Sequence, residues 1–230
     1  KENQIRRDFP ESVLNEAEAF PKRVAMNSVP GRVDQRHLDY VTIDGESARD
    51  FDDAVCVREG KEGGFRLFVA IADVANYIIP GSLLDGEARR RGTSVYFPTH
   101  AIPMLPEALS NGLCSLQPAV NRLALTCEME LNSKGECVGY EIYQSLIRSR
   151  ARLDYEGVTA FLDNGSGPLK DPERQKELKR MQRLMRLLEE KRKRRGAIQF
   201  EFPETAVEFD EQEKMTGMAR KFQSTGMKII

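Results

Sequence analysis

The chain contains 230 residues, of which 40% are hydrophobic and 31% are charged, and its formal net charge at pH 7 is −1. This composition is typical of a globular protein with one large core or two smaller ones, and it excludes nucleic-acid binding through overall basicity. No apolar run approaches the ~20 residues of a membrane span, and residues 1–4 are charged or polar, unlike a signal peptide. We therefore expect a cytoplasmic protein that does not enter the membrane.

The first half of the sequence predicts strands with short helices around them. Glycines between two apolar runs and prolines after residue 97 mark the turns and loops. The first expected elements are a turn and helix from Phe9 to about Phe20, with its start favoured by Ser12 or the acids nearby, and neighbouring strands at 40–43, 54–57 and 65–71, the last two as a hairpin. A helix at 83–91, a short strand at 94–97 that ends at Pro98, and a loop-rich stretch at 99–117 are expected next.

The second half predicts a hairpin followed by helices. Residues 122–131 and 136–147 are strand-like and flank Asn132-Ser133-Lys134-Gly135, a strong hairpin turn. The helices and loop expected after it are a short helix at 155–162, an exposed loop at 163–168 and a long helix at 172–195. Strands and helices without regular alternation predict an α+β fold, with a largely antiparallel or mixed sheet flanked by helices.

Four cysteines are spread along the chain: Cys56, Cys114, Cys127 and Cys137. They form no C-x-x-C pair, and only His37 and His100 are available as imidazole companions. This spacing disfavours a structural zinc site. We expect reduced, mostly buried thiols.

The long helix at 172–195 has one apolar face and many basic residues. Its predicted buried stripe, at three- and four-residue steps, is Leu178, Met181, Leu184, Met185 and Leu188, and Gly196 is expected to close the helix. The exposed lysines and arginines could hold RNA phosphates. The alternative, a solvated face of an amphipathic helix, is the more usual meaning of such a charge run and is favoured here.

Four aspartates gather between the first two predicted strands. Asp44, Asp50, Asp52 and Asp53 would repel one another by ~1 kcal/mol per close pair in water and ~4 kcal/mol near a protein surface. A divalent cation removes that cost, and hard oxygen donors favour magnesium, manganese or calcium over zinc. The cluster therefore predicts a metal site, although an acidic, solvated loop that binds nothing is as consistent with these residues alone.

Geometry restricts how the cluster can work. If residues 50–53 are extended, Asp50 and Asp52 face one side and Asp53 faces the other, so one site that uses all four aspartates needs a loop or bulge. An EF-hand calcium loop that starts at Asp44 would need Gly at position 6 and Glu at position 12, where this sequence has Arg49 and Val55. The calcium-loop alternative fails on this spacing.

The same segment carries a family resemblance. Residues 42–54 have the pattern T-I-D-G-x-x-x-x-D-x-D-D-A, which resembles the signature of the ribonuclease II family and is closest to its ribonuclease R branch. The blocks that continue the resemblance, in family order, are I-A-D-V at 71–74, R-G-T-S-V-Y-F-P at 91–98, I-P-M-L-P at 102–106, L-S-N-G-L-C-S-L at 109–116, S-R-A-R-L at 149–153 and R-R-G-A-I at 194–198. The chain thus resembles the N-terminal part of the family's catalytic (RNB) domain, from Thr42 to about Phe200. Gln35 and Asn76 replace a common Leu and a common His.

The resemblance implies a site and an activity. It implies that Asp44, Asp50, Asp52 and Asp53 together form the catalytic metal site, with magnesium or manganese as the cofactor. It also implies a hydrolytic 3′ to 5′ exoribonuclease that binds RNA with a free 3′ end and releases nucleoside 5′-monophosphates processively. Two metals about 4 Å apart can generate hydroxide and stabilise the leaving oxygen in such a reaction.

Three further residues need interpretation. From the sequence alone, an aromatic on a strand such as Tyr96 is more often a core residue. The resemblance instead implies that Tyr96 stacks on a base near the 3′ end of the RNA, a contact that tolerates any sequence and contributes ~1–3 kcal/mol per base. Phe97, on the opposite face of the strand, is expected in the core. Asp73 could cap a helical turn at 74–77 or belong to the acidic region, and the cap is favoured.

Both ends of the chain look cut, since it starts without Met and stops on apolar residues. In the family, the catalytic domain continues with an arginine-rich segment and a glutamate for the same site, and OB-type RNA-binding domains flank it. We therefore expect residues 1–33 to be a linker and helix, residues 34–230 to be a catalytic domain truncated at its C-terminus, and the chain alone to be inactive. The alternatives are a noncatalytic RNA-binding protein that retains the fold, which the intact aspartate set argues against, and an acidic calcium-binding module.

Overall fold

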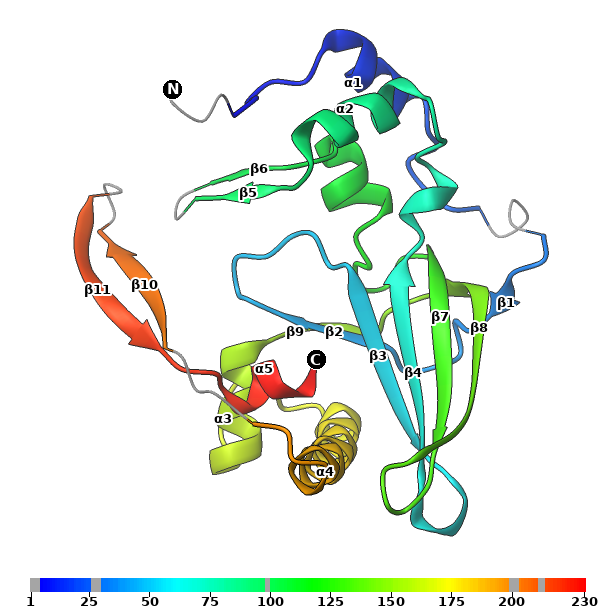
Figure 1. Ribbon diagram of the computed structural model, residues 1–230, viewed down its shortest axis with the longest axis vertical. Coiled ribbons are helices and arrows are strands. Elements are labelled where there is room, and N and C mark those ends of the chain that lie inside the picture. The colour runs from blue at the N-terminus through cyan, green and yellow to red at the C-terminus, as the bar shows by residue number, and fades with distance from the viewer. Residues whose placement is uncertain (1–4, 26–29, 98–99, 199–202, 211–213) are drawn as a thin grey trace.

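The computed structural model describes residues 5–25, 30–97, 100–198, 203–210 and 214–230 (Figure 1). The predicted strand end at Pro98 lies outside the described residues. The polar residues 1–4 and the end of the family resemblance near Phe200 also lie outside them.

A seven-stranded mixed sheet forms the centre of the fold, in the strand order β1-β8-β7-β4-β3-β2-β9. Neighbouring strands from β8 to β2 pair antiparallel, whereas the outermost pairs, β1–β8 and β2–β9, are parallel. The strand bounds are β1 (Val33–Asp34), β2 (Val41–Asp44), β3 (Asp53–Glu59), β4 (Phe65–Ala72), β7 (Arg122–Leu131), β8 (Cys137–Ile147) and β9 (Ala151–Asp154). The predicted α+β fold with a largely antiparallel, mixed sheet is confirmed.

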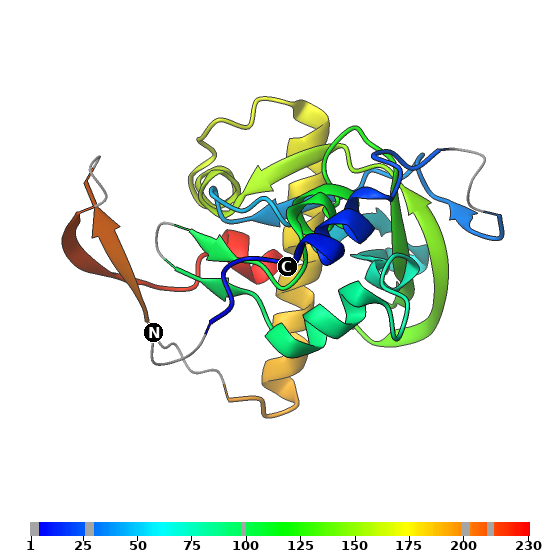
Figure 2. The ribbon, with the colours of Figure 1, turned by 90° about the horizontal axis from the view of Figure 1, so that it is seen from above.

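Two antiparallel hairpins lie outside this sheet. The first joins β5 (Val95–Tyr96) to β6 (Ala101–Ile102), and the second joins β10 (Glu204–Phe209) to β11 (Met215–Lys221). Figures 1 and 2 show β10 and β11 projecting away from the rest of the chain.

Helices cover the two faces of the sheet. The helices with their bounds are α1 (Glu11–Glu18), α2 (Leu83–Arg91), α3 (Tyr155–Asn164), α4 (Pro172–Arg194) and α5 (Thr225–Ile229), with short helical turns at Lys61–Gly63, Val74–Asn76 and Ala108–Leu113. Side chains alternate along β3, so Ala54 and Cys56 join a core with α1, α2 and the Ala108–Leu113 turn, whereas Val55 and Val57 join a core with α3 and α4. The sheet therefore separates two hydrophobic cores.

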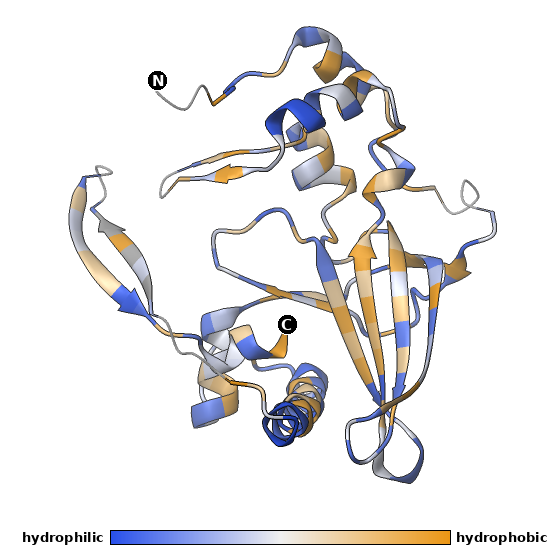
Figure 3. Ribbon diagram, in the orientation of Figure 1, coloured by the Kyte–Doolittle hydropathy of each residue, from blue (hydrophilic) through white to orange (hydrophobic). Residues whose placement is uncertain are grey.

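The predicted amphipathic stripe of α4 is confirmed at four of its five residues. Leu178, Met181 and Leu184 are each at most 3% exposed, Leu188 packs partly buried against the same core, and Met185 is half-buried outside it. Figure 3 shows both hydrophobic and hydrophilic residues on this helix. Gly196 has a φ of 82°, and its N–H donates to the carbonyl of Lys193 at 2.9 Å, which closes the helix as expected.

The predicted β7–β8 hairpin is also confirmed. Asn132 Oδ1 accepts hydrogen bonds from the N–H groups of Lys134 and Glu136, both at 3.0 Å, and Gly135 has a φ of 75°. The other predicted strands and helices are present with ends shifted by a few residues.

The helix expected after Phe9 begins at Glu11, so an acid lies in its first turn as expected, whereas Ser12 does not cap it because the N-cap position is Pro10 without a side-chain cap. The stretch 99–117 is loop-rich as expected, and its described part also contains β6 and the Ala108–Leu113 turn. The position predicted for Phe97 is wrong. Phe97 is 39% exposed and stacks on His100 with ring centroids 4.9 Å apart. It is not in the core because β5 pairs only with β6, outside the main sheet.

The cap predicted for Asp73 is wrong as well. A helical turn does follow it, but its carboxylate makes no cap and instead accepts from Arg32 Nη2 at 2.5 Å. The same nitrogen of Arg32 donates to Asn76 Oδ1 at 3.1 Å. The side chains of Arg32 and Asp73 are 5% and 9% exposed. The carboxylate therefore forms a buried ion pair with Arg32 instead of accepting from the N–H groups of the turn.

All four cysteines are free, as expected, with Cys56 and Cys114 buried, Cys127 intermediate and Cys137 exposed. Across the described ranges, no helix has the length and apolar character that crossing a membrane requires.

Candidate active site

The acidic loop, residues 44–53, joins β2 to β3. Asp44 is the last residue of β2 and pairs with Asp154 of the parallel strand β9, and Asp53 is the first residue of β3. Asp50 and Asp52 lie in the irregular backbone between these strands. The irregular backbone that a site with all four aspartates needs is therefore present.

Ser115 fixes the loop on both sides of Asp50. Its hydroxyl donates to the carbonyl of Arg49 at 2.7 Å and accepts from the N–H of Phe51 at 3.1 Å. The N–H of Leu116 donates to the carbonyl of Phe51 at 2.8 Å, and both Ser115 and Leu116 are fully buried. Because these contacts come from buried backbone and side chain, they hold Asp50 on a rigid support.

Arg152 holds the start of the loop from β9. Its Nη2 donates to the carbonyls of Gly45 and Glu46 at 2.8 and 2.5 Å. Its guanidinium carbon lies 5.7 Å from the centroid of the Phe51 ring. One positively charged side chain thus contacts the loop backbone at two points and lies over an aromatic residue of the same loop.

The carboxylates of the acidic loop act on one another electrostatically. Burial, followed by the charge of Asp53, raises the pKa of Asp44 from 3.8 to about 6, while Arg152 opposes the rise. Burial also raises the pKa of Asp52, with further contributions from Asp50 and Asp53, and burial raises the pKa of Asp53. The aspartates are therefore close enough to disfavour one another's ionised forms.

The donor chemistry of the loop fits a hard divalent cation, because mutually repelling carboxylates are stabilised by such an ion. In the described part of the chain, however, no three His, Cys, Asp or Glu side chains are arranged to hold one metal ion. The four-aspartate metal site stays a prediction that rests on donor type and electrostatic proximity.

Tyr96 lies beside the loop on β5. Its hydroxyl donates to Asp50 Oδ2 at 2.8 Å, and this hydrogen bond, together with burial, raises the pKa of Tyr96. The side chain is nevertheless 67% exposed. The structure therefore brings Tyr96 to Asp50 while leaving aromatic surface accessible to a ligand.

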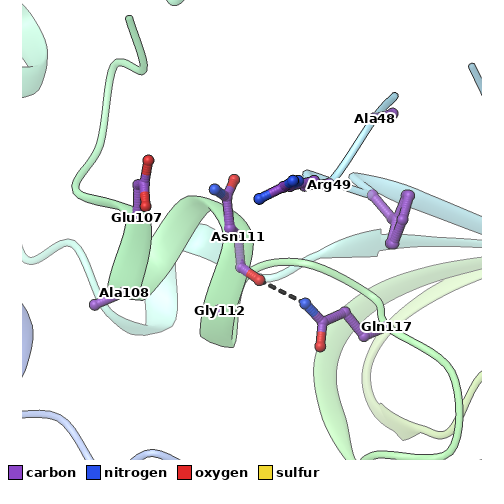
Figure 4. Close-up of a pocket in the computed structure, with 8 residues that line it drawn as sticks. Ala48, Arg49, Glu107, Ala108, Asn111, Gly112 and Gln117 are labelled. Carbon is purple, nitrogen blue, oxygen red and sulfur yellow. Dashed lines mark hydrogen bonds between the residues drawn. The ribbon is translucent and has the colours of Figure 1, made fainter. Parts of the chain in front are cut away.

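Two cavities adjoin the loop. The first, of about 590 Å³, lies between the loop and the β5–β6 hairpin, and its lining includes Asp50, Tyr96 and Phe97. The second, of about 510 Å³, shares Arg49 and Asn111 with the first, and Figure 4 shows these two side chains extending toward each other. Gln117 Nε2 donates to the carbonyl of Asn111 at 2.6 Å and supports this wall.

Sequence reasoning did not assign roles to Ser115, Arg152, Arg49 or Asn111. Ser115 and Arg152 lie 66 and 107 residues from the loop positions that they contact, so no local pattern connects them to it. The only signal was that Ser115, Arg152 and Asn111 fall within blocks of the family resemblance.

These features define an α+β domain with a carboxylate-rich candidate active site. Residues 32–230 match the sequence model of the RNB domain, and the chain belongs to that family. The resemblance to the ribonuclease II family is thereby confirmed. The roles of the individual site residues and the division at residues 33 and 34 stay predictions.

Similar proteins include "Ribonuclease R" of Vibrio parahaemolyticus, which is 44% identical over 230 residues, or 99% of this chain and 27% of that protein. The structure of Mycoplasma genitalium RNase R in complex with ribose-methylated single-stranded RNA superposes with a TM-score of 0.91 at 32% identity, covering 99% of this chain and 35% of that one. Yeast Ssd1, described as a pseudonuclease, matches with a TM-score of 0.62 at 22% identity over 75% of this chain and 21% of that one, which shows the fold alone. The chain spans about a quarter of the length of its ribonuclease R relative.

Proposed function

We propose that the chain is part of the catalytic domain of a magnesium-dependent exoribonuclease that hydrolyses RNA from its 3′ end. The observation that carries the proposal is the acidic loop of an RNB domain, in which Asp44, Asp50, Asp52 and Asp53 lie between the end of β2 and the start of β3 and Asp50 accepts a hydrogen bond from the exposed Tyr96. The name and the RNA ligand of the similar proteins support RNA as the substrate.

Asp44, Asp50, Asp52 and Asp53 would hold magnesium or manganese. When bound, such ions supply a hydroxide nucleophile near neutral pH and stabilise charge on the leaving oxygen. Ser115 and Arg152 keep the loop in place, since both bind its backbone.

Tyr96 would position the substrate by stacking on a base near the 3′ end. Stacking accepts every base, which suits an enzyme that removes any nucleotide. The adjoining 590 Å³ cavity offers space for a terminal nucleotide, and Arg49 in its wall is a donor for phosphate. The same proposal includes processive release of nucleoside 5′-monophosphates, with the RNA retained between cleavage steps. It also includes a cytoplasmic location.

The chain by itself is expected to be inactive, because its relatives are several times longer and would contribute further domains to the site and to RNA binding. Purified chain should leave 3′-tailed RNA intact in magnesium. A full-length protein that contains this sequence should degrade the same RNA to mononucleotides in magnesium and stop in EDTA. Cleavage that persists in EDTA would reject the metal-dependent mechanism.

Substitution Asp52→Asn in the full-length protein tests the acidic loop directly. We expect cleavage to fall by at least about a thousandfold, roughly 4 kcal/mol, because a metal ligand is lost where charge develops. RNA binding measured in EDTA should change little. Glu46→Gln is the matched control, since it removes one negative charge from an exposed side chain of the same loop.

The second candidate is a noncatalytic RNA-binding protein, which the likeness to the fold of yeast Ssd1 keeps in view. That candidate predicts RNA binding without cleavage by the unmodified full-length protein. Magnesium-dependent release of mononucleotides, abolished by Asp52→Asn and retained by Glu46→Gln, would exclude it.

A further inference from the structure

A cationic cavity lies at the other end of β2 from the acidic loop. This cavity, the arginine pocket, has a volume of about 350 Å³ and is lined by Asp34, Arg36, His37, Arg148 and Arg150. The N–H of Arg150 donates to the carbonyl of Tyr40, directly before β2, whereas Asp44 ends that strand. At ~3.3 Å per residue, the backbones at these two ends are roughly 13 Å apart, so the pocket is separate from the candidate active site.

The segment 148–150 presents two arginines on one side. Ser149 between them is 2% exposed, its hydroxyl lies 3.2 Å from the carbonyl of Ala151, and its own carbonyl accepts from the N–H of Ala119 at 2.9 Å. Alternate residues of an extended segment point in opposite directions. Because Ser149 points inward, Arg148 and Arg150 both lie on the exposed side.

The opposite wall is held by a buried glutamine. Gln35 is 4% exposed, its N–H donates to the carbonyl of Leu146 at 2.9 Å, and its Oε1 accepts from the Tyr40 hydroxyl at 2.7 Å. Arg36, the next residue, donates from Nε and Nη2 to the two oxygens of Asp34 at 2.8 and 2.5 Å. This double contact fixes the plane of the Arg36 guanidinium at the pocket.

The guanidinium groups keep hydrogen-bond donors free. Arg150 Nη2 donates to the carbonyl of Arg36 at 3.1 Å, and Arg148 Nε donates to Asn121 Oδ1 at 3.2 Å. Among the residues that the structure describes, neither terminal nitrogen of Arg148 has an acceptor, nor does Nη1 of Arg36 or of Arg150. These donors surround a solvent-accessible space.

The pocket also has excess positive charge. Three arginines line it, against Asp34 inside and Asp39 at its border, 3.5 Å from Arg150 Nε. Asp39 is shared with a further arginine, Arg174, whose Nη2 lies 3.6 Å away. Planar guanidiniums with free donors are suited to tetrahedral oxyanions, above all phosphate groups.

We propose that the arginine pocket binds a phosphodiester group of RNA, at a site distinct from the one that cleaves it. The identification of the phosphate as part of RNA rests on the proposed function, whereas its recognition by Arg148, Arg150 and Arg36 rests on the geometry of the pocket. Because the arginines are partly exposed, the contact is salt-dependent.

The test is the salt dependence of RNA binding by this chain, measured in EDTA so that no cleavage occurs. The affinity for a fluorescein-labelled single-stranded RNA is compared between the unmodified chain and the double variant Arg148→Ala/Arg150→Ala. The slope of log affinity against log salt should fall in magnitude by about 0.7, which is the contribution of one neutralised phosphate on a single strand. Arg148→Ala alone should give about half of that change.

The matched control is Arg192→Ala/Lys193→Ala, which also removes two positive charges from exposed side chains but lies in the last turn of α4. The proposal requires this control to keep the slope of the unmodified chain. It is overturned if both double variants change the slope equally, if neither changes it, or if the unmodified chain does not bind RNA at low salt. Displacement of the RNA by a polyglutamate peptide at equal charge concentration would assign the pocket to an acidic protein segment and also overturn it.

These outcomes are independent of the cleavage experiments. Absence of magnesium-dependent cleavage by the full-length protein would remove the proposed function, whereas an unchanged salt slope in Arg148→Ala/Arg150→Ala would remove only the second site.

Discussion

The acidic loop and α4 are both runs of like charge, but they differ in whether their charged side chains have partners in the fold. Between Arg174 and Arg195 there are eleven Lys or Arg residues against three Glu. Several of these bind fixed acceptors: Arg174 pairs with Glu177 at 2.5 Å, Arg180 donates to the carbonyl of Val57 at 2.8 Å, and Lys191 donates to that of Gly135 at 2.9 Å. Arg180 and Lys191 therefore hold the helix to β3 and to the β7–β8 turn, whereas the Arg174 pair lies within α4.

The carboxylates of the acidic loop lack such compensation. Arg152 and Ser115 bind the backbone of the loop, and Tyr96 donates to Asp50, yet the pKa values of Asp44, Asp52 and Asp53 are raised. A run of like charges has a structural role where neighbouring residues supply acceptors or opposite charges for it. Where the fold gathers like charges and leaves them to repel, a ligand is the natural partner.

The structural role of α4 can be broken at its buried stripe. Leu178→Ala should lower the free energy of unfolding by roughly 2–5 kcal/mol, because it leaves a cavity in the core shared with the sheet. Arg186→Ala, on the exposed side of the same helix, should change it by no more than about 0.5 kcal/mol. Urea unfolding of the chain measures both. Equal effects would show that α4 is not held by its apolar face.

The support of the acidic loop can be broken from β9. In a full-length protein, Arg152→Ala should lower kcat by about a hundredfold with little change in KM. The substitution removes the hydrogen bonds to the carbonyls of Gly45 and Glu46, so the loop can shift slightly from its reactive position. Arg152→Lys should restore part of the loss, because it keeps the charge but only one donor group. An unchanged kcat would mean that Ser115 and the strands position the loop without Arg152.

A smaller effect is expected from the one acid of α4 whose pKa is raised. Burial outweighs Arg174 at Glu177 and raises its pKa from 4.5 to about 7. The folded state therefore binds more protons than the unfolded state between these values, so stability from this group is lost as pH rises through that window. In Glu177→Gln, the decline in unfolding free energy across the window should be smaller by on the order of 1 kcal/mol. A parallel decline in both proteins would show that the Arg174 pair keeps Glu177 ionised.

The fold was predictable where the sequence has strong periodicity. The stripe of α4 and the turn at Asn132–Gly135 are local patterns whose cause is local, and the structure confirms them. β1 and β9 were not predicted, because each is short and exists through parallel pairing with a distant strand. Phe97 was assigned to the core because it lies on the opposite face of its strand from Tyr96, whereas β5 belongs to a separate hairpin outside the main sheet.

The candidate site was predictable to a similar extent. The four aspartates lie in one segment, so their grouping follows from sequence, and the family blocks brought in Tyr96. The hydrogen bond from Tyr96 to Asp50 crosses 46 positions, and the supports from Ser115 and Arg152 cross more. Contacts of this kind depend on how the strands are ordered, which local chemistry does not specify. Asp73 illustrates the same limit, since its distant partner Arg32 overrode the favoured local cap.

If the aspartates of the acidic loop are brought together to hold a divalent metal, a full-length protein crystallised in manganese should show the anomalous signal of the ion at the loop. We expect a peak within about 2 Å of carboxylate oxygens from at least two of Asp44, Asp50, Asp52 and Asp53. In crystals of Asp52→Asn the peak should be absent or have much lower occupancy. A map with no anomalous peak at the loop, from crystals in which those side chains are ordered, would contradict a metal-binding role for these aspartates.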